Sequence, residues 1–158
     1  MKTAIIFYSY DRNCALCAGI MKSALNADVF EIKTVDSRRR KGFMKILWGA
    51  SQVIFKKKPA IHPLSVIPEN YDLIILGTPV WAGSPAPAIV SFLDKKKIAE
   101  KKVALFCCHG GGMGTVFEKL KALLPGNNFS PDLELKEPLM ADRQEVEQKI
   151  RDWVKTIG

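Results

Sequence analysis

One short apolar run in the middle of the chain limits the folds that are open to it. The run Leu73–Gly77 is too short for a helix and is typical of a strand buried on both faces. Pro79 follows closely, and because it has no N–H to donate we expect the strand to end there. Trp81–Gly83 comes next, an aromatic residue beside two residues small enough for close backbone approach. A buried strand that opens into such a loop is typical of ligand sites in open α/β sheets.

Strand-like and helix-like segments alternate along the rest of the chain. Some segments are continuous apolar runs, and others carry apolar residues at helical spacing. This alternation predicts an α/β fold in which helices cover both faces of a parallel sheet. The other expected strands are Thr3–Tyr8, Asp28–Ile32, Lys102–Cys107 and an edge strand, Phe129–Leu135. The expected helices are Asn13–Leu25, Arg38–Lys58, Ala88–Leu93, Val116–Leu124 and Glu145–Ile157.

Length and composition limit the class of protein. A chain of 158 residues with 47% hydrophobic residues is long enough for one domain and too short for two, so we expect a single domain over residues 1–158. There is no apolar run of 18 or more residues, and Met1–Thr3 passes into the first strand without a signal-peptide cleavage site. Four cysteines are too few for a disulfide scaffold. These features predict a cytoplasmic protein with reduced thiols.

Three loops of the chain resemble the flavin-binding loops of the flavodoxin family. The sequence SYDRNC at Ser9–Cys14 looks like the flavodoxin phosphate loop, Ser-x-Thr-Gly-Asn-Thr. GTPVWAGSPAP at Gly77–Pro87 and FCCHGGGMGT at Phe106–Thr115 resemble the two loops that contact the flavin ring. The resemblance spans essentially the whole chain. It implies a flavodoxin-like three-layer sandwich with a five-stranded parallel sheet of order 2-1-3-4-5, in which the loops after strands one, three and four hold FMN.

The resemblance implies an FMN-binding electron-transfer protein. One alternative is an FMN-dependent NAD(P)H:quinone-type oxidoreductase, and a second is a flavin-free thiol-redox or interaction module. The sequence does not decide whether the protein is an electron carrier or an enzyme. It contains no dinucleotide fingerprint G-x-G-x-x-G, and no substrate pocket can be identified. No catalytic residue and no metal ligand is assigned. The implied FMN contacts are Ser9, Asp11, Arg12, Asn13, Cys14, Thr78, Pro79, Val80, Trp81, Ala82, Gly83, Cys108, His109, Gly110, Gly111, Gly112 and Gly114.

The first loop suits an anion even without the resemblance. A tight turn from a strand into a helix directs several N–H groups and the positive end of the helix dipole at one point. Arg12 stands where the family has glycine, and Cys14 where it has a hydroxyl, so one flexible position and one hydrogen bond are missing. The Arg12 guanidinium could bind phosphate directly, whereas Asp11 would repel it unless its carboxylate caps the helix. An ordinary capped helix start is the alternative interpretation.

The other two loops suit a flat ring with a polar rim. Trp81 can cover a ring face, and the peptide between Ala82 and Gly83 can approach a ring edge closely. The glycines at 110–112 and 114 can wrap their N–H groups around a ring edge. The alternative for Trp81 is a half-buried surface aromatic. For His109 we favour an exposed loop histidine over one that responds to flavin charge.

The cysteines support a competing hypothesis. Cys14 and Cys17 form a C-x-x-C at an expected helix start, a position that favours thiolates and thus thiol–disulfide chemistry. Adding Cys107, Cys108 and His109 from the same sheet edge would allow a zinc or iron–sulfur site, although two adjacent cysteines are poor spacing for zinc. Small packing thiols are the interpretation that we favour.

A basic segment suggests an acidic partner. The net charge is +8, and Arg38–Lys41 and Lys56–Lys58 flank an apolar stretch that contains Trp48. We prefer electrostatic steering of an acidic redox partner protein, while peripheral contact with an anionic membrane through residues 38–58 is a weaker interpretation. The apolar stripe equally suits a crossover helix with solvated charged ends. Nucleic acid is not expected, because the basic residues are not interleaved with stacking aromatics.

Overall fold

A computed structural model describes residues 1–36, 51 and 58–158, and strands and helices alternate through them. The strands are β1 (Thr3–Tyr8), β2 (Asp28–Ile32), β3 (Leu73–Trp81), β4 (Ser84–Pro85), β5 (Lys102–His109), β6 (Asn128–Phe129) and β7 (Leu133–Lys136). The helices are α1 (Asn13–Leu25), α3 (Pro87–Lys95), α4 (Val116–Ala122) and α5 (Arg143–Ile157), with a 3-10 helix at Pro68–Asn70. The expected helix Arg38–Lys58 lies outside the described residues apart from Ser51 and Lys58, so it stays a prediction.

The strands form a sheet that is parallel except where β4 pairs with β3. Neighbouring strands follow the order β2-β1-β3-β5-β6, and β7 also pairs with β5. This matches the predicted flavodoxin-like order, with β6 and β7 together in the place of the fifth strand. The prediction of one continuous edge strand, Phe129–Leu135, is wrong because residues 130–132 separate its two pieces. Pro131 lies in this gap, and a proline has no N–H to donate to the ladder with β5.

The central strand continues past the point where the sequence predicts its end. We expect β3 to stop at Pro79, but it runs to Trp81 and then turns back into β4. Its ladder with β1 ends where Phe7 pairs with Gly77, while the ladder with β5 continues to Pro79 opposite Cys108. A strand that has lost a neighbour on one side tolerates a proline, as edge strands do. β3 therefore extends beyond the end of β1.

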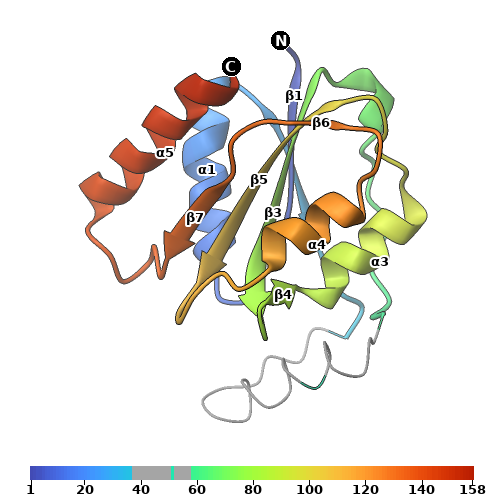
Figure 1. Cartoon of the computed structure of the whole chain (residues 1–158), viewed down its shortest axis with the longest axis horizontal. Coiled ribbons are helices and arrows are strands. Elements are labelled where there is room, and N and C mark those ends of the chain that lie inside the picture. The colour runs from blue at the N-terminus through green and yellow to red at the C-terminus, as the bar shows by residue number, and fades with distance from the viewer. Residues whose placement is uncertain (37–50, 52–57) are drawn as a thin grey trace.

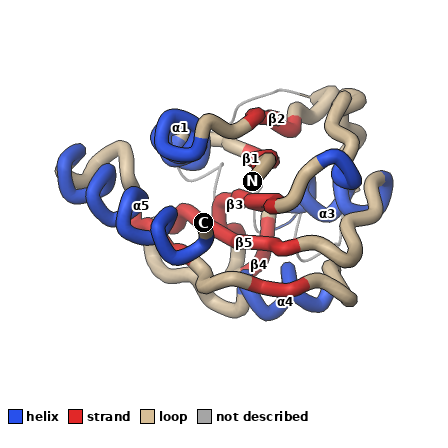
Figure 2. Tube along the Cα trace, turned by 90° about the horizontal axis from the view of Figure 1, so that it is seen from above, coloured by secondary structure: helices blue, strands red, loops and turns tan. Residues whose placement is uncertain are grey.

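Helices cover both faces of the sheet, and each face has its own apolar core. Figures 1 and 2 show α1 and α5 on one face and α3 and α4 on the other. Successive strand residues alternate between the two cores. Ile75 packs with the side chains of α1 and α5, whereas Ile74 packs with those of α3 and α4, and both are 0% exposed. The prediction that β3 is buried on both faces is confirmed.

Local sequence signals set the helix starts. Pro87 opens α3, where its missing N–H costs nothing, one residue before the predicted start. The Asp142 side chain caps α5 by accepting hydrogen bonds from the N–H groups of Gln144 and Glu145, at 2.9 and 3.0 Å. None of the helices in the described part of the chain is long and apolar enough to cross a membrane.

Candidate functional site

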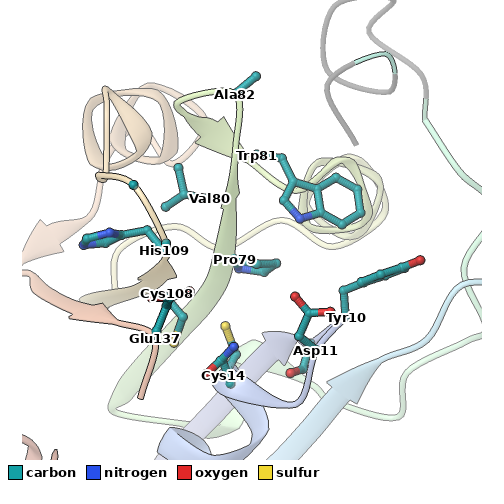
Figure 3. A pocket seen from close by; sticks show the side chains of 14 residues that line it. Tyr10, Asp11, Cys14, Pro79, Val80, Trp81, Ala82, Cys108, His109 and Glu137 are labelled. Atoms are coloured by element: carbon teal, nitrogen blue, oxygen red, sulfur yellow. The ribbon is translucent and has the colours of Figure 1, made fainter. Parts of the chain in front are cut away.

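A cavity opens at the carboxyl ends of the parallel strands. Its volume is about 480 Å³, and ligand pockets usually measure about 300–1,000 Å³. Figure 3 shows that its walls come from three places: the β1–α1 loop, the end of β3 with its turn into β4, and the end of β5 with the loop that follows. Glu137, directly after β7, completes the lining. In open α/β sheets this edge is where ligands bind.

The β1–α1 loop presents a helix start to the cavity. Arg12, the residue before α1, has a φ of 69°, in the left-handed region that favours glycine. The Ser9 hydroxyl accepts a hydrogen bond from the N–H of Ala15 at 3.2 Å, which holds the loop against the first helical turn. Arg12 makes no side-chain cap, and the first turn of α1 contains no acidic residue. The positive end of the α1 dipole is therefore not neutralised from within its first turn.

Two side chains of this loop have partners that lie elsewhere. Nη1 of Arg12 is 3.0 Å from Oε1 of Glu31 on β2, and the Arg12 side chain is 54% exposed. The guanidinium thus pairs with a carboxylate and does not line the cavity. Oδ1 of Asn13 accepts a hydrogen bond from the N–H of Leu139 at 3.0 Å, which ties the start of α1 to the segment after β7.

Aromatic rings form one wall of the cavity. Trp81 packs edge-to-face against Tyr8 and Tyr10, with ring centroids 6.0 and 5.7 Å apart. Figure 3 shows Trp81 and Tyr10 together on the side away from His109. The buried hydroxyl of Thr78 accepts a hydrogen bond from the N–H of Ala86 at 3.0 Å, which ties β3 to the start of α3. Trp81 is thus half-buried and also lines the cavity, which combines the two interpretations of this residue.

Glycines hold the two remaining loops against each other. The N–H of Thr115 donates to the carbonyl oxygen of Gly83 at 3.2 Å. A Cβ on Gly114 would lie 2.5 Å from the Cα of Gly83, so only glycine allows this approach. Nζ of Lys119 donates to the Ser84 hydroxyl at 2.6 Å and ties α4 to β4. The β3–β4 turn and the loop after β5 therefore form one connected rim.

His109 is more buried than the sequence suggests. Its side chain is 10% exposed, and its Nε2 lies 3.4 Å from Oε2 of Glu134 on β7. In Figure 3 the ring points away from Trp81. The expectation of an exposed loop histidine is wrong, because the end of β7 pairs alongside His109 and the N–H of Glu137 donates to its carbonyl oxygen at 2.9 Å.

All four cysteines are free and buried. The Sγ atoms of Cys17 and Cys108 lie 3.8 Å apart. The hydrogen bond with Cys108 and burial raise the pKa of Cys17, and the pKa of Cys108 is raised by a hydrogen bond with Cys14 and by burial. Burial raises the pKa of Cys107 to about 12, and the nearby carboxylates add to this. Among the residues that the structure describes, no group of three or more His, Cys, Asp or Glu is arranged to hold a metal ion.

The cavity gathers most, but not all, of the predicted contact residues. Those that line it are Ser9, Asp11, Asn13, Cys14, Pro79, Val80, Trp81, Ala82, Cys108, His109, Gly110 and Gly111. Those outside the lining are Arg12, Thr78, Gly83, Gly112 and Gly114. The sequence prediction omitted Tyr10 and Glu137, which also line it. Glu137 follows the last strand, and the rule that carboxyl ends of parallel strands share one edge could have identified it.

Comparisons with known proteins place this architecture among flavodoxins. The sequence model of the family described as Flavodoxin matches residues 2–157. A flavoprotein from Lactobacillus acidophilus, solved in complex with FMN, is 26% identical with a TM-score of 0.71, over 91% of this chain and 98% of that chain. A Bacteroides eggerthii protein is 21% identical with a TM-score of 0.77, over 99% and 97% of the two chains.

A more distant structure has the same fold. A flavodoxin from Fusobacterium nucleatum, bound to flavin mononucleotide, is 16% identical with a TM-score of 0.61, over 99% of this chain and 97% of that chain. At this level of identity the similarity establishes the fold alone. A comparison of the sequence with curated proteins gives no match.

Proposed function

The chain belongs to the flavodoxin family, and on this premise we propose that its cavity binds FMN and that the protein transfers electrons. The observation that carries the proposal is that three loops, distant in the sequence, line one cavity at the carboxyl edge of the sheet. FMN, when bound, supplies the electron-transfer chemistry, while the protein binds and orients it and sets its electrostatic surroundings.

The phosphate end of the cavity fits the cofactor through its backbone. The loop keeps a left-handed residue immediately before α1, although an arginine stands there in place of glycine. Such a turn directs helix N–H groups at an anion, and the dipole of α1 adds to the attraction. Asp11 lines the same end, and its carboxylate opposes a phosphate. We expect the backbone donors to dominate, because several of them converge on one point.

The ring end fits a flat apolar group. Trp81 and Tyr10 provide an aromatic wall, and Val80 and Pro79 add apolar surface. Gly110 and Gly111 border the cavity without side chains, and a Cβ added at Gly111 would have no atom within 4 Å. A flavin needs this combination of an apolar face and accessible backbone groups along its edge.

Titration of the flavin-free protein with FMN tests the proposal. We expect flavin fluorescence to be quenched with a dissociation constant on the order of micromolar or lower. Trp81→Ala should weaken binding about tenfold through loss of the aromatic wall, while Trp81→Phe should retain most of the affinity. Riboflavin, which has the same ring but no phosphate, should bind more weakly than FMN. Binding that is absent or only millimolar would reject the proposal.

A second measurement tests electron transfer. The FMN-loaded protein is reduced chemically and mixed with an oxidised one-electron acceptor protein. We expect rapid reoxidation by the acceptor and no reduction of the oxidised protein by NADH or NADPH alone. Rapid, saturable reduction by NADPH would instead identify a reductase and replace the carrier role.

A further inference from the structure

Three cysteines from two elements meet at the wall of the cavity. Cys14 and Cys17 lie in α1, Cys108 lies near the end of β5, and all three belong to the core between the sheet and α1 and α5. The Sγ atoms of Cys17 and Cys108 are 3.8 Å apart. Cys14 and Cys108 also line the cavity. Cys107, its neighbour in sequence, lies in the opposite core, as alternation along a strand requires.

We propose that Cys17 and Cys108 form a reversible dithiol–disulfide pair, which a small peroxide oxidises from the cavity. The two sulfurs are already in contact across the packed boundary between α1 and β5. A disulfide requires an S–S distance of about 2.0 Å, so side-chain rotation has to shorten the present contact. Both residues are nearly inaccessible, with exposures of 0% and 4%, so a protein oxidant cannot reach them and a small molecule must enter through the cavity.

The oxidation balances with hydrogen peroxide as the oxidant. The thiolate form of Cys108, a residue that lines the cavity, attacks one peroxide oxygen, the O–O bond breaks, and the other oxygen leaves as water after taking up the proton that the thiol released. The raised pKa of Cys108 keeps this thiolate scarce at neutral pH, so the oxidation is slow there. Cys108 is then a sulfenic acid. The Cys17 sulfur attacks it, an S–S bond forms, the S–O bond breaks, and a second water leaves with the Cys17 proton. The two thiols lose two electrons, and one peroxide becomes two waters.

The disulfide would join the two elements that carry the first and third loops of the cavity. α1 begins directly after the β1–α1 loop, and Cys108 precedes the glycine loop. Oxidation therefore acts on the region where the proposed flavin binds. Formation of the disulfide does not require flavin, because the two cysteines and hydrogen peroxide are the only reactants. A flavin-free preparation tests the disulfide separately from the proposed function.

Peptide mapping of the full chain provides the test. The protein is reduced, freed of reductant and flavin, treated with hydrogen peroxide, alkylated under denaturing conditions and digested with trypsin. Cleavage gives peptides 13–22 and 103–119, which contain Cys14 with Cys17 and Cys107 with Cys108. We expect these peptides to become disulfide-linked and to separate again after dithiothreitol. Fragment ions between the two cysteines of each peptide should assign the bond to Cys17 and Cys108.

Matched variants sharpen the assignment. Cys107→Ala removes the adjacent thiol in the opposite core and should leave the disulfide link between the two peptides intact. Cys108→Ala should abolish this link. Circular dichroism checks that each variant is folded. If a variant does not fold, the fragment ions from the wild-type protein still show which two cysteines form the bond. Unlinked peptides with irreversibly oxidised thiols, or a bond through Cys14 or Cys107, would overturn the proposal.

Discussion

At the scale of single residues, Arg12 shows how a loop can keep its shape after losing its usual glycine. Its φ of 69° is a conformation in which a side chain is strained by about 1 kcal/mol. The guanidinium pairs with Glu31 at 3.0 Å, an exposed contact that contributes little stability. Packing around the loop, including the bond from the N–H of Ala15 to Ser9, must therefore hold this conformation.

Substitutions at Arg12 separate backbone strain from side-chain effects. We expect Arg12→Gly to be more stable than Arg12→Ala by about 1 kcal/mol, because only glycine adopts this φ without strain. Both variants lose the contact with Glu31, so comparing them cancels that loss. Urea denaturation of both variants measures the difference. Equal stabilities, or a more stable alanine variant, would show that the left-handed conformation carries no strain.

The buried thiol of Cys107 should make stability depend on pH. Burial raises its pKa from 9.0 to about 12, so the folded state holds the proton where the unfolded state releases it. This contribution to stability is fully present below pH 9.0 and is lost as the pH rises toward 12. We expect the free energy of unfolding, measured with reductant present, to fall above pH 9.0. This fall should be shallower in Cys107→Ala. If the free energy of unfolding of the variant fell with pH as steeply as that of the wild-type protein, the Cys107 thiol would not be its cause.

At the scale of elements, the sequence predicted the strands and helices whose bounds depend on neighbouring residues, and it failed where the bounds depend on tertiary contacts. α1, β1 and β2 have the predicted bounds. β3 was predicted too short. Its ladder can include Pro79 because β1 ends at that level, and the end of β1 relative to β3 depends on the tertiary structure, which the local sequence does not reveal. The last strand is interrupted at Pro131, whose carbonyl oxygen accepts a hydrogen bond from Nε1 of Trp153 at 2.7 Å. Spacing alone cannot reveal that partner.

The outline of the candidate site was also predictable from local sequence. Loops that resemble known binding loops identified three of its walls. Arg12 and Thr78 lie outside the lining because their side chains are directed to Glu31 and to the N–H of Ala86, contacts that bring together distant segments. Glu137 was missed because its segment resembles no binding loop. Its place depends on the pairing of β7 with β5.

The contact between the β3–β4 turn and the loop after β5 gives a prediction at this scale. In Gly114→Ala the new Cβ would lie 2.5 Å from the Cα of Gly83, and the φ of 56° adds strain. We expect a loss of about 1–3 kcal/mol in the free energy of unfolding and weaker FMN binding, because the rim must open. Gly111→Ala is the control for stability, since no atom lies within 4 Å of its Cβ position. Equal losses of stability in both variants would contradict the proposed contact.

At the scale of the whole molecule, the sheet separates the cavity from the chain ends. Figure 1 shows the carboxyl ends of β3 and β5 at one edge of the sheet and both termini at the opposite edge. The cavity lies at those carboxyl ends. A tag or surface anchor at either terminus should therefore leave the cavity accessible. This arrangement allows binding of flavin and partner proteins to be measured on an immobilised protein.

The net charge of the molecule suggests its partner. The sequence carries 24 basic and 16 acidic residues, a net charge of +8, and we propose that the protein exchanges electrons with an acidic partner. Steering between opposite charges acts over about a Debye length, which is about 10 Å at 0.1 M salt. The rate constant for electron transfer to an acidic acceptor protein should therefore fall steeply as salt rises.

Stopped-flow measurements from low to high ionic strength test this prediction. The FMN-loaded, reduced protein is mixed with an acidic acceptor protein and, as the control, with a neutral quinone. The rate for the quinone should hardly change with salt, because no charge steers it. If the rate for the acidic acceptor were also independent of salt, or rose with it, the excess of basic residues would have no part in partner recognition.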